Sequence, residues 1–485
     1  MSTLARTQVS LGTGMALRLV GDEAEANPFQ GQRIHFTGIG GSGMCGLAAM
    51  LLALGARVSG TDRAASNVTH RLAEAGATVS YEQVGESIPA ETQLLVYSSA
   101  IKEDHPERVT AAQRGLATVK YAQMLGRVMA LKHGVTIAGT HGKSTTTALT
   151  AHVLLQAGID PSFVVGATCP QLGGSSRSGS SDIFVVEACE FDRSFHHLHP
   201  NIGVVLNVEE DHLDYYKDLD EIIASFAQYL SQVHPLGLVL VNGSDPNSLK
   251  AAQGAKARVE TFGIEIPADW SADQIQIGRG KARFRLSYRG QVMGPLELSI
   301  PGRHNIANAT VAAAIAHNAG VPWDKIQAGI NSFAGADRRS QLIGMVNDVA
   351  LVDDYGHHPT EIQATLTALR EQYEPQRLIC VFQPHQHSRT RLLLEDFSKS
   401  FRAADLAIIP DIYYARDSED DRKAITSTIL VEHINAKSSN AQYIGTFSDV
   451  VKYLEAYVRP GDLVVSMGAG PVWEVTDELV RRLRR

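Results

Sequence analysis

One glycine-rich loop constrains the fold of this chain more than any other feature of its sequence. Gly139-Thr140-His141-Gly142-Lys143-Ser144-Thr145 lies between an apolar run at residues 135–138 and a helix-like pattern at residues 145–157. The backbone N–H groups of such a turn can hold the inner phosphates of a nucleotide, Lys143 would reach the outer phosphates, and Ser144 would offer a hydroxyl to Mg²⁺. Ile137 stands where a full Walker A sequence has glycine. Gly-Lys-Ser at a strand-to-helix turn nevertheless predicts an ATP-binding α/β domain.

A second glycine cluster precedes it. Gly38-Ile39-Gly40-Gly41-Ser42-Gly43 fits G-x-G-x-x-G between a strand-like segment at 33–37 and a helix-like segment at 43–54, and Asp62 follows the next strand. Glycines there let the backbone approach a pyrophosphate, and an acidic side chain after the second strand can accept hydrogen bonds from ribose-like hydroxyls. Taken alone, this pattern favours an NAD-dependent dehydrogenase. Another nucleotide diphosphate and a purely structural turn remain open at this point.

Acidic side chains follow two further predicted strands. Glu187 ends an apolar run at 183–186, and Glu209-Glu210-Asp211-His212 comes after a run at 202–206. Mg²⁺ prefers hard oxygen ligands, and ligands of open α/β sheets collect at the carboxyl ends of the strands. The sequence therefore indicates a magnesium site here, with a solvated acidic loop as the alternative.

Histidine-rich segments follow two strands near the C-terminus, at residues 353–359 and 383–391. Paired histidines can indicate a transition metal, but no H-x-x-x-H spacing or cysteine pair supports a catalytic zinc site. Recognition of a polar substrate is the favoured interpretation, and a satisfied surface cluster is the alternative.

The order of these segments predicts three α/β units in series, the central one P-loop-like with an antiparallel insert at residues 257–300, and the outer two Rossmann-like. The expected boundaries are an N-terminal extension at 1–30, then domains at 31–132, 133–334 and 335–485. A chain of 485 residues is too long for one core.

Composition excludes several classes of function. The formal net charge is -8 with no basic stripe, which argues against a nucleic-acid partner. The four cysteines lack metal-ligand spacing and are too few for a disulfide framework, which indicates a reducing compartment. No run of 18 apolar residues and no signal pattern is present, so we expect a cytoplasmic protein without a membrane partner, as a monomer or homodimer.

Taken together, the motifs resemble those of the Mur ligases from Arg33 to the C-terminus. The resemblance rests on six segments in order, at residues 38–44, 139–146, 209–214, 302–309, 353–359 and 382–390. It implies a cytoplasmic enzyme of peptidoglycan synthesis that uses ATP and Mg²⁺ to join the lactyl carboxylate of UDP-N-acetylmuramate to L-alanine. The carboxylate would first become an acyl phosphate, which the amine then attacks.

The resemblance also assigns residues to four groups. The UDP-sugar would contact Gly40, Gly41, Ser42, Gly43, Asp62, Ser98, Ser99 and Ala100. ATP would contact Gly139, Thr140, His141, Gly142, Lys143, Ser144, Thr145, Asn305, Arg339 and Asp354. The metal would be held by Ser144, Glu187 and His212, and the amino acid by Tyr355, His357 and Arg389. The catalytic group would be Lys143, Glu187, His212 and His357.

Several positions depart from the family pattern, namely Cys189, Phe191, Ser340 and the pair Gln386-His387. The last pair lies close to the expected amino-acid pocket, so glycine and serine remain open beside L-alanine. Three rival functions also remain: a recycling ligase that attaches a whole peptide to the same sugar, an NAD-dependent oxidoreductase, and a non-catalytic nucleotide-binding regulator. The oxidoreductase would leave Gly142-Lys143-Ser144 without a role.

Overall fold

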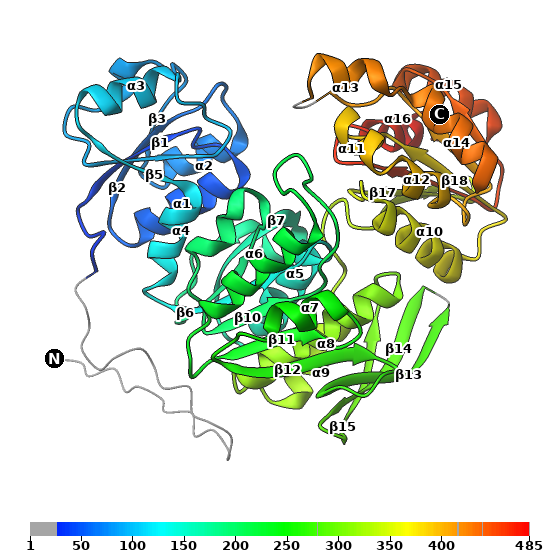
Figure 1. Ribbon diagram of the computed structural model, residues 1–485, viewed down its shortest axis with the longest axis horizontal. Helices are drawn as coiled ribbons and strands as arrows, with labels where there is room; N and C mark the ends of the chain where they lie inside the picture. The colour runs from blue at the N-terminus through cyan, green and yellow to red at the C-terminus, as the bar shows by residue number, and fades with distance from the viewer. Residues whose placement is uncertain (1–26, 279, 415–416, 439, 485) are drawn as a thin grey trace.

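The computed structural model describes residues 27–278, 280–414, 417–438 and 440–484. They form three α/β units, each built on its own sheet, with the central unit between the other two (Figure 1). The expected extension at 1–30 lies outside the described residues except for its last four, and the Phe29 side chain packs into the core of the first unit. No helix in the described part of the chain is long and apolar enough to cross a membrane.

The first unit is a five-stranded parallel sheet in the order β3-β2-β1-β4-β5. Its strands are β1 (Arg33–Thr37), β2 (Arg57–Thr61), β3 (Thr78–Ser80), β4 (Leu94–Tyr97) and β5 (Ala117–Lys120). Its helices are α1 (Ser42–Ala53), α2 (Asn67–Glu74), η1 (Gly85–Ser87), α3 (Pro106–Gln113) and α4 (Tyr121–Met129). In the register of β1, Thr37 is paired with Thr61 of β2 and Tyr97 of β4. The segments after these three strands therefore share one edge of the sheet.

The central unit is a ten-stranded sheet in the order β15-β14-β13-β12-β11-β10-β6-β9-β7-β8. Its parallel strands are β6 (His133–Ala138), β7 (Ser162–Cys169), β9 (Ile183–Glu187), β10 (Ile202–Val205), β11 (Leu238–Asn242) and β12 (Arg258–Ile264). Antiparallel pairing involves β8 (Gly174–Arg177), β13 (Trp270–Gly278), β14 (Lys281–Tyr288) and β15 (Gln291–Leu298). The antiparallel part thus begins at β13, later than the expected start at residue 257, because β12 pairs in parallel with both neighbours.

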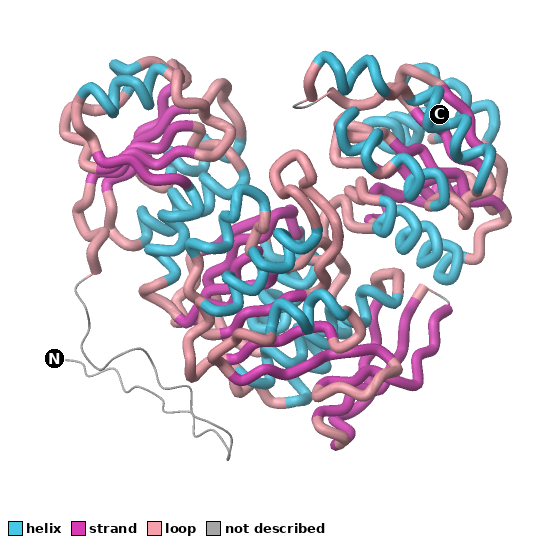
Figure 2. The backbone as a smooth tube through the Cα atoms, viewed as in Figure 1, coloured by secondary structure: helices cyan, strands magenta, loops and turns pink. Residues whose placement is uncertain are grey.

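Helices cover both faces of this sheet (Figure 2). They are α5 (Lys143–Gln156), η2 (Pro170–Leu172), η3 (Phe191–His197), α6 (Leu219–Ser231), α7 (Pro246–Ala252), α8 (Arg303–Asn318) and α9 (Trp323–Ser332). Helix α5 is buried on all sides from Ser144 to Leu154. Its Ala and Thr side chains are small enough to pack against the alanine-rich α8. This packing fixes the start of α5, where the glycine-rich loop ends.

The third unit has a six-stranded sheet in the order β16-β17-β21-β18-β19-β20, parallel except for β16. Its strands are β16 (Gln341–Val346), β17 (Val349–Asp354), β18 (Arg377–Phe382), β19 (Leu406–Ile409), β20 (Ala441–Tyr443) and β21 (Asp462–Met467). Its helices are α10 (Pro359–Tyr373), α11 (His387–Leu392), α12 (Leu394–Lys399), α13 (Glu419–Ala424), α14 (Ser427–Lys437), α15 (Phe447–Tyr457) and α16 (Trp473–Leu483). Helix α10 lies on the side that faces the central unit (Figure 1).

Strand order explains why distant motifs meet. In the central sheet β6 lies between β10 and β9, so the segments that follow these three strands converge at one edge. Those segments are the glycine-rich loop, the residues around Glu187 and the residues after Leu206. The third unit brings the start of α10 and the loop after β18 against the same edge, through hydrogen bonds such as Thr360 Oγ1 to Glu209.

Candidate active site

The glycine-rich loop of the central unit forms the base of the site. Gly139 and Gly142 have positive φ angles of 146° and 84°, and no side chain in the described segments caps the start of α5. A Cβ on Gly139 would lie 2.9 Å from the side chain of Leu206, so only glycine fits there. Asn207 holds the loop by accepting a hydrogen bond from the His141 amide at 2.8 Å. The loop therefore presents free helix N–H groups in a fixed geometry, as anion binding requires.

Lys143 is folded back onto this loop. Its Nζ donates to the carbonyl oxygens of Gly139 and Thr140 at 2.6 and 3.0 Å, and to Glu190 Oε1 at 2.9 Å. Burial opposes the charge on Lys143, but the Glu190 carboxylate outweighs it, so the pKa of the ammonium is raised. Burial likewise opposes the charge on Glu190, and Lys143 lowers the pKa of that carboxyl. Both groups are ionised, and the cation is held where an outer phosphate would lie.

The expected metal ligands lie beside the lysine. Ser144 Oγ donates to Glu187 Oε1 at 3.1 Å, and the other oxygen of Glu187 accepts from the Gly166 amide at 2.6 Å. His212 Nε2 lies 3.6 Å from Glu190 Oε1, and its buried Nδ1 has no hydrogen-bond partner among the described residues. The Ser144 hydroxyl and the Glu187 carboxylate supply oxygen ligands that suit Mg²⁺ beside phosphate oxygens and water, whereas the imidazole of His212 is a nitrogen ligand that Mg²⁺ favours less. Glu190, which joins Lys143 to His212, was not among the predicted site residues, although it lies three positions after Glu187.

A cavity of about 320 Å³ opens beside the loop. Asn305 lies in its wall, buried, and donates to the Pro301 carbonyl at 2.6 Å. His304 lines it as well, and burial lowers the pKa of that imidazole to about 4, so the ring is neutral. Two other lining residues, Asn242 and Phe262, could not be predicted from the sequence, because their segments carry no phosphate-binding pattern. The volume and the mixed apolar and polar lining suit a nucleotide base and ribose.

The third unit closes this cavity with Arg339 and Asp354. Arg339 Nη2 donates to Ser144 Oγ at 3.1 Å, and its buried Nε has no hydrogen-bond partner in the part of the chain described. Asp354 accepts hydrogen bonds from the Ser340 and Gly356 amides at 2.7 and 2.6 Å. Burial raises the pKa of Asp354 to about 6. The guanidinium reaches the loop through Nη2 and keeps an unpaired N–H at Nε, so it has a donor available for a phosphate oxygen.

The expected amino-acid residues also come from the third unit. The Tyr355 ring lies 4.9 Å from the Arg339 guanidinium and packs edge-on against His357. Burial lowers the pKa of His357 to about 4. Arg389 Nη2 donates to Asp211 Oδ1 of the central unit at 3.0 Å, and a small hollow beside this pair is lined by Gln386 and Leu392. His387 lies 3.2 Å from Asp417, so of the two unusual residues Gln386 faces the hollow.

The first glycine cluster shapes a separate cradle in the first unit. The Gly40 amide donates to Asp62 Oδ2 at 2.7 Å, so Asp62 holds the loop itself. A Cβ on Gly43 would lie 2.7 Å from the Tyr121 ring, and Gly41 precedes α1, which begins at Ser42. Ser98, Ser99 and Ala100 follow β4 at the same sheet edge, where Ile101 N donates to Ser98 O at 3.0 Å. The cradle and this turn follow the neighbouring strands β1 and β4.

Three protein-family models match the chain in succession. "Mur ligase family, catalytic domain" matches residues 33–133, "Mur ligase middle domain" matches 137–316, and "Mur ligase, glutamate ligase domain" matches 338–470. The chain belongs to the Mur ligase family. This Mur ligase is 41% identical over 456 residues to the UDP-N-acetylmuramate–L-alanine ligase of Caldanaerobacter subterraneus, with 94% of this chain and 98% of the relative covered.

Solved structures agree with the family assignment. The UDP-N-acetylmuramate-alanine ligase of Thermotoga maritima matches with a TM-score of 0.77 and 22% identity, covering 93% of this chain and 99% of that one. A murein peptide ligase from Psychrobacter arcticus matches with a TM-score of 0.70 and 26% identity, covering 93% and 99%. Both share the three-unit α/β architecture of this Mur ligase, and the predicted fold class is therefore confirmed.

Proposed function

We propose that this chain is the ATP- and Mg²⁺-dependent ligase that joins L-alanine to the lactyl carboxylate of UDP-N-acetylmuramate, in the cytoplasm, for peptidoglycan synthesis. The observation that carries the proposal is the convergence of Lys143, Ser144 and Glu187 with Arg339 and Arg389 of the third unit. The name of the 41% identical relative supports the choice of substrates. The proposed domains are residues 31–132 for the UDP-sugar, 133–334 for ATP and 335–485 for the amino acid.

The chemistry follows from the charges that these residues supply. A carboxylate is a poor electrophile, and transfer of the γ-phosphoryl group converts it to an acyl phosphate with a good leaving group. Lys143 and Arg339 would stabilise charge on the transferring oxygens. Mg²⁺ held by Ser144, Glu187 and His212 would neutralise further phosphate charge.

The second step needs an amine beside the acyl phosphate. Arg389 would hold the carboxylate of the amino acid, with Tyr355 and His357 lining its position. His357 is neutral because of its burial, so it does not repel an ammonium group. The amine, formed when the ammonium group loses a proton, attacks the acyl carbon. The C–O bond to phosphate then breaks, and a second proton leaves the nitrogen with the phosphate. Water has to be excluded throughout, which supports a role for the third unit as a cover over the central one.

A phosphate-release assay tests this proposal. Purified enzyme with UDP-N-acetylmuramate, ATP and Mg²⁺ is expected to release phosphate when L-alanine is added. Parallel reactions with glycine or serine in place of L-alanine test whether Gln386 changes the preference for the amino acid. Phosphate release with a tripeptide and with none of the three amino acids would instead establish a recycling ligase. Binding of NAD to the first unit in place of the UDP-sugar would contradict both the L-alanine ligase and the recycling ligase.

A further inference from the structure

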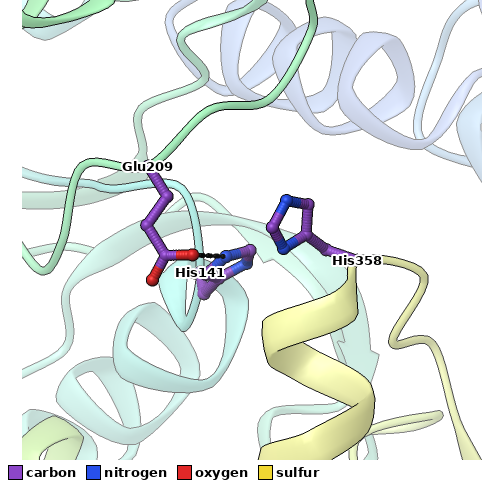
Figure 3. A group of neighbouring side chains, drawn as sticks. All are labelled: His141, Glu209 and His358. Carbon is purple, nitrogen blue, oxygen red and sulfur yellow. Dashed lines mark ion pairs between the residues drawn. The ribbon is translucent and has the colours of Figure 1, made fainter. Parts of the chain in front are cut away.

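A group of three side chains lies at the contact between the central and third units. One of them, His141, was expected to contact ATP, but no step of the proposed reaction uses the three as a group. Figure 3 shows His141, Glu209 and His358 pointing toward one another. One nitrogen or oxygen atom from each lies within 4.8 Å of the others. His141 belongs to the glycine-rich loop, Glu209 follows β10, and His358 precedes α10. The group therefore unites residues that are far apart in the sequence and come from two units.

His141 is oriented so that one ring nitrogen faces a carboxylate outside the group and the other faces Glu209. Its Nδ1 lies 3.0 Å from Glu361 Oε1, an ideal distance for an N–H group that donates to a carboxylate. Its Nε2 is buried, has no hydrogen-bond partner in the described ranges, and lies 3.5 Å from Glu209 Oε2. A histidine that binds a metal commonly donates its second ring N–H to a carboxylate in this manner. Burial opposes a charge on His141, but the Glu361 and Glu209 carboxylates outweigh it and raise the pKa of the ring to about 9. Without a metal ion Nε2 therefore carries a proton toward Glu209, and a bound ion would take the place of that proton.

The second histidine is held by hydrogen bonds at both ring nitrogens. His358 Nε2 lies 3.1 Å from the Glu210 carbonyl oxygen, and a carbonyl only accepts, so Nε2 carries the proton. The lone pair of His358 is then on Nδ1, which receives a single long hydrogen bond of 3.3 Å from the Thr360 amide. The third member, Glu209, accepts from Thr360 Oγ1 at 2.6 Å, which orients its carboxylate.

We propose that His141, Glu209 and His358 form a binding site for a transition-metal ion of the Zn²⁺ class, separate from the Mg²⁺ position at Ser144 and Glu187. Two imidazole nitrogens and one carboxylate, with water as the fourth ligand, suit Zn²⁺ or Co²⁺, whereas Mg²⁺ prefers oxygen ligands. Bonds of about 2.0–2.2 Å require the ligand atoms to approach to roughly 3.3 Å. The ligand atoms therefore have to move as much as about 1.5 Å closer together. His358 Nδ1 also has to exchange its hydrogen bond from the Thr360 amide for the ion.

The position of the site gives a bound ion a defined consequence. His141 and Glu209 belong to the central unit and His358 to the third, so the ion links the two units directly. The same two units cover the nucleotide cavity, which His141 and Glu209 also line. An ion at this site therefore holds the third unit against the central one and slows the separation that exchange of substrates requires.

Titration of the full-length, nucleotide-free enzyme tests the site. Co²⁺ is expected to bind with the visible absorption of a four-coordinate ion, and calorimetry with Zn²⁺ should give one equivalent. Glu209→Gln and His358→Asn should each weaken Zn²⁺ binding at least tenfold, and Glu361→Gln should weaken it less, because Glu361 only orients His141. Asparagine is a good helix N-cap, so His358→Asn preserves the start of α10.

A matched control separates this site from adventitious binding by surface histidines. His199 is exposed and lies in the segment His196-His197-Leu198-His199, so His199→Ala should retain the wild-type affinity. Zn²⁺ should also raise the thermal midpoint of the wild type and not that of Glu209→Gln. Equal binding by Glu209→Gln and His358→Asn, or loss of binding in His199→Ala or Glu187→Gln, would overturn the proposal.

Discussion

The ion pair between Arg389 and Asp211 is expected to set how firmly the third unit contacts the central one. Arg389 Nη2 and Asp211 Oδ1 are 3.0 Å apart, and their side chains are only 10% and 9% exposed. Burial opposes the charge of Asp211, but Arg389 outweighs it, and the pKa of the carboxyl falls far below its usual range. Both groups are therefore charged and shielded from water only while the two units are in contact.

The magnitude follows from this burial. Removing one partner of a buried ion pair costs about 3–5 kcal/mol, because the other charge remains without compensation. Asparagine keeps one hydrogen-bond acceptor, so Asp211→Asn should cost about 3 kcal/mol. The cost applies only to the contacting arrangement, since both groups are hydrated when the units separate. At about 1.4 kcal/mol per factor of ten, the contact equilibrium should shift roughly a hundredfold toward separation.

Energy transfer between fluorophores on exposed residues of the two units, such as Lys256 and Glu432, measures this equilibrium. Asp211→Asn should lower the transfer efficiency. The exchange Asp211→Arg with Arg389→Asp should restore it without restoring turnover, because the reversed pair no longer presents a cation to the amino acid. Unchanged transfer in Asp211→Asn, or a double variant no better than the single ones, would refute the reasoning.

Three further predictions concern the other units of the site. Lys143→Ala should abolish phosphate release while calorimetry shows unchanged UDP-sugar binding, because the two cradles are separate; loss of both would contradict this. Gly43→Ala should weaken UDP-sugar binding more than Gly41→Ala in the same calorimetry, since its Cβ would lie 2.7 Å from Tyr121, against 3.4 Å for the nearest atom to Gly41. Asp354 keeps its proton up to about pH 6 when folded but only to about pH 4 when unfolded, so its contribution to the free energy of unfolding falls as pH rises between these values. Urea denaturation of Asp354→Asn should lack that slope.

Much of the site was predictable because its residues follow strands. Glu187 and the loop ending at Lys143 come directly after apolar runs, and parallel strands bring such positions to one sheet edge. The glycine positions were informative for a local reason, since Gly139 and Gly142 have backbone angles that other residues rarely adopt. These features depend on short segments and on the regularity of parallel sheets.

Contacts between units were not predictable in this way. Nothing near His141 in the sequence indicates that Glu361 of α10 lies 3.0 Å away.

The antiparallel insert was expected to start at residue 257, earlier than its observed start at β13, and a buried polar residue explains the difference. β12 contains Glu260, whose polarity suggests a solvent-facing strand, but the side chain is buried and accepts from Trp270 Nε1 and Tyr288 OH, both at 2.9 Å. A strand with a buried polar side chain shows the same alternation of polar and apolar residues in the sequence as a strand with one face exposed to solvent.

Two cations of the site, Lys143 and Arg389, share a property that bears on how substrates bind. Lys143 is paired with Glu190 and Arg389 with Asp211, so neither meets an anionic substrate as a bare charge. A phosphate or carboxylate of the substrate must replace the internal carboxylate that is paired with the cation. The net gain in binding free energy is therefore the difference between two charged interactions. The displaced carboxylates then have to be stabilised elsewhere. Glu190 is within 3.6 Å of His212 and so remains beside a metal ligand, whereas Asp211 loses its contact across the two units. Binding of the amino acid at Arg389 should therefore loosen the very contact that holds the third unit in place, unless the substrate itself bridges both units.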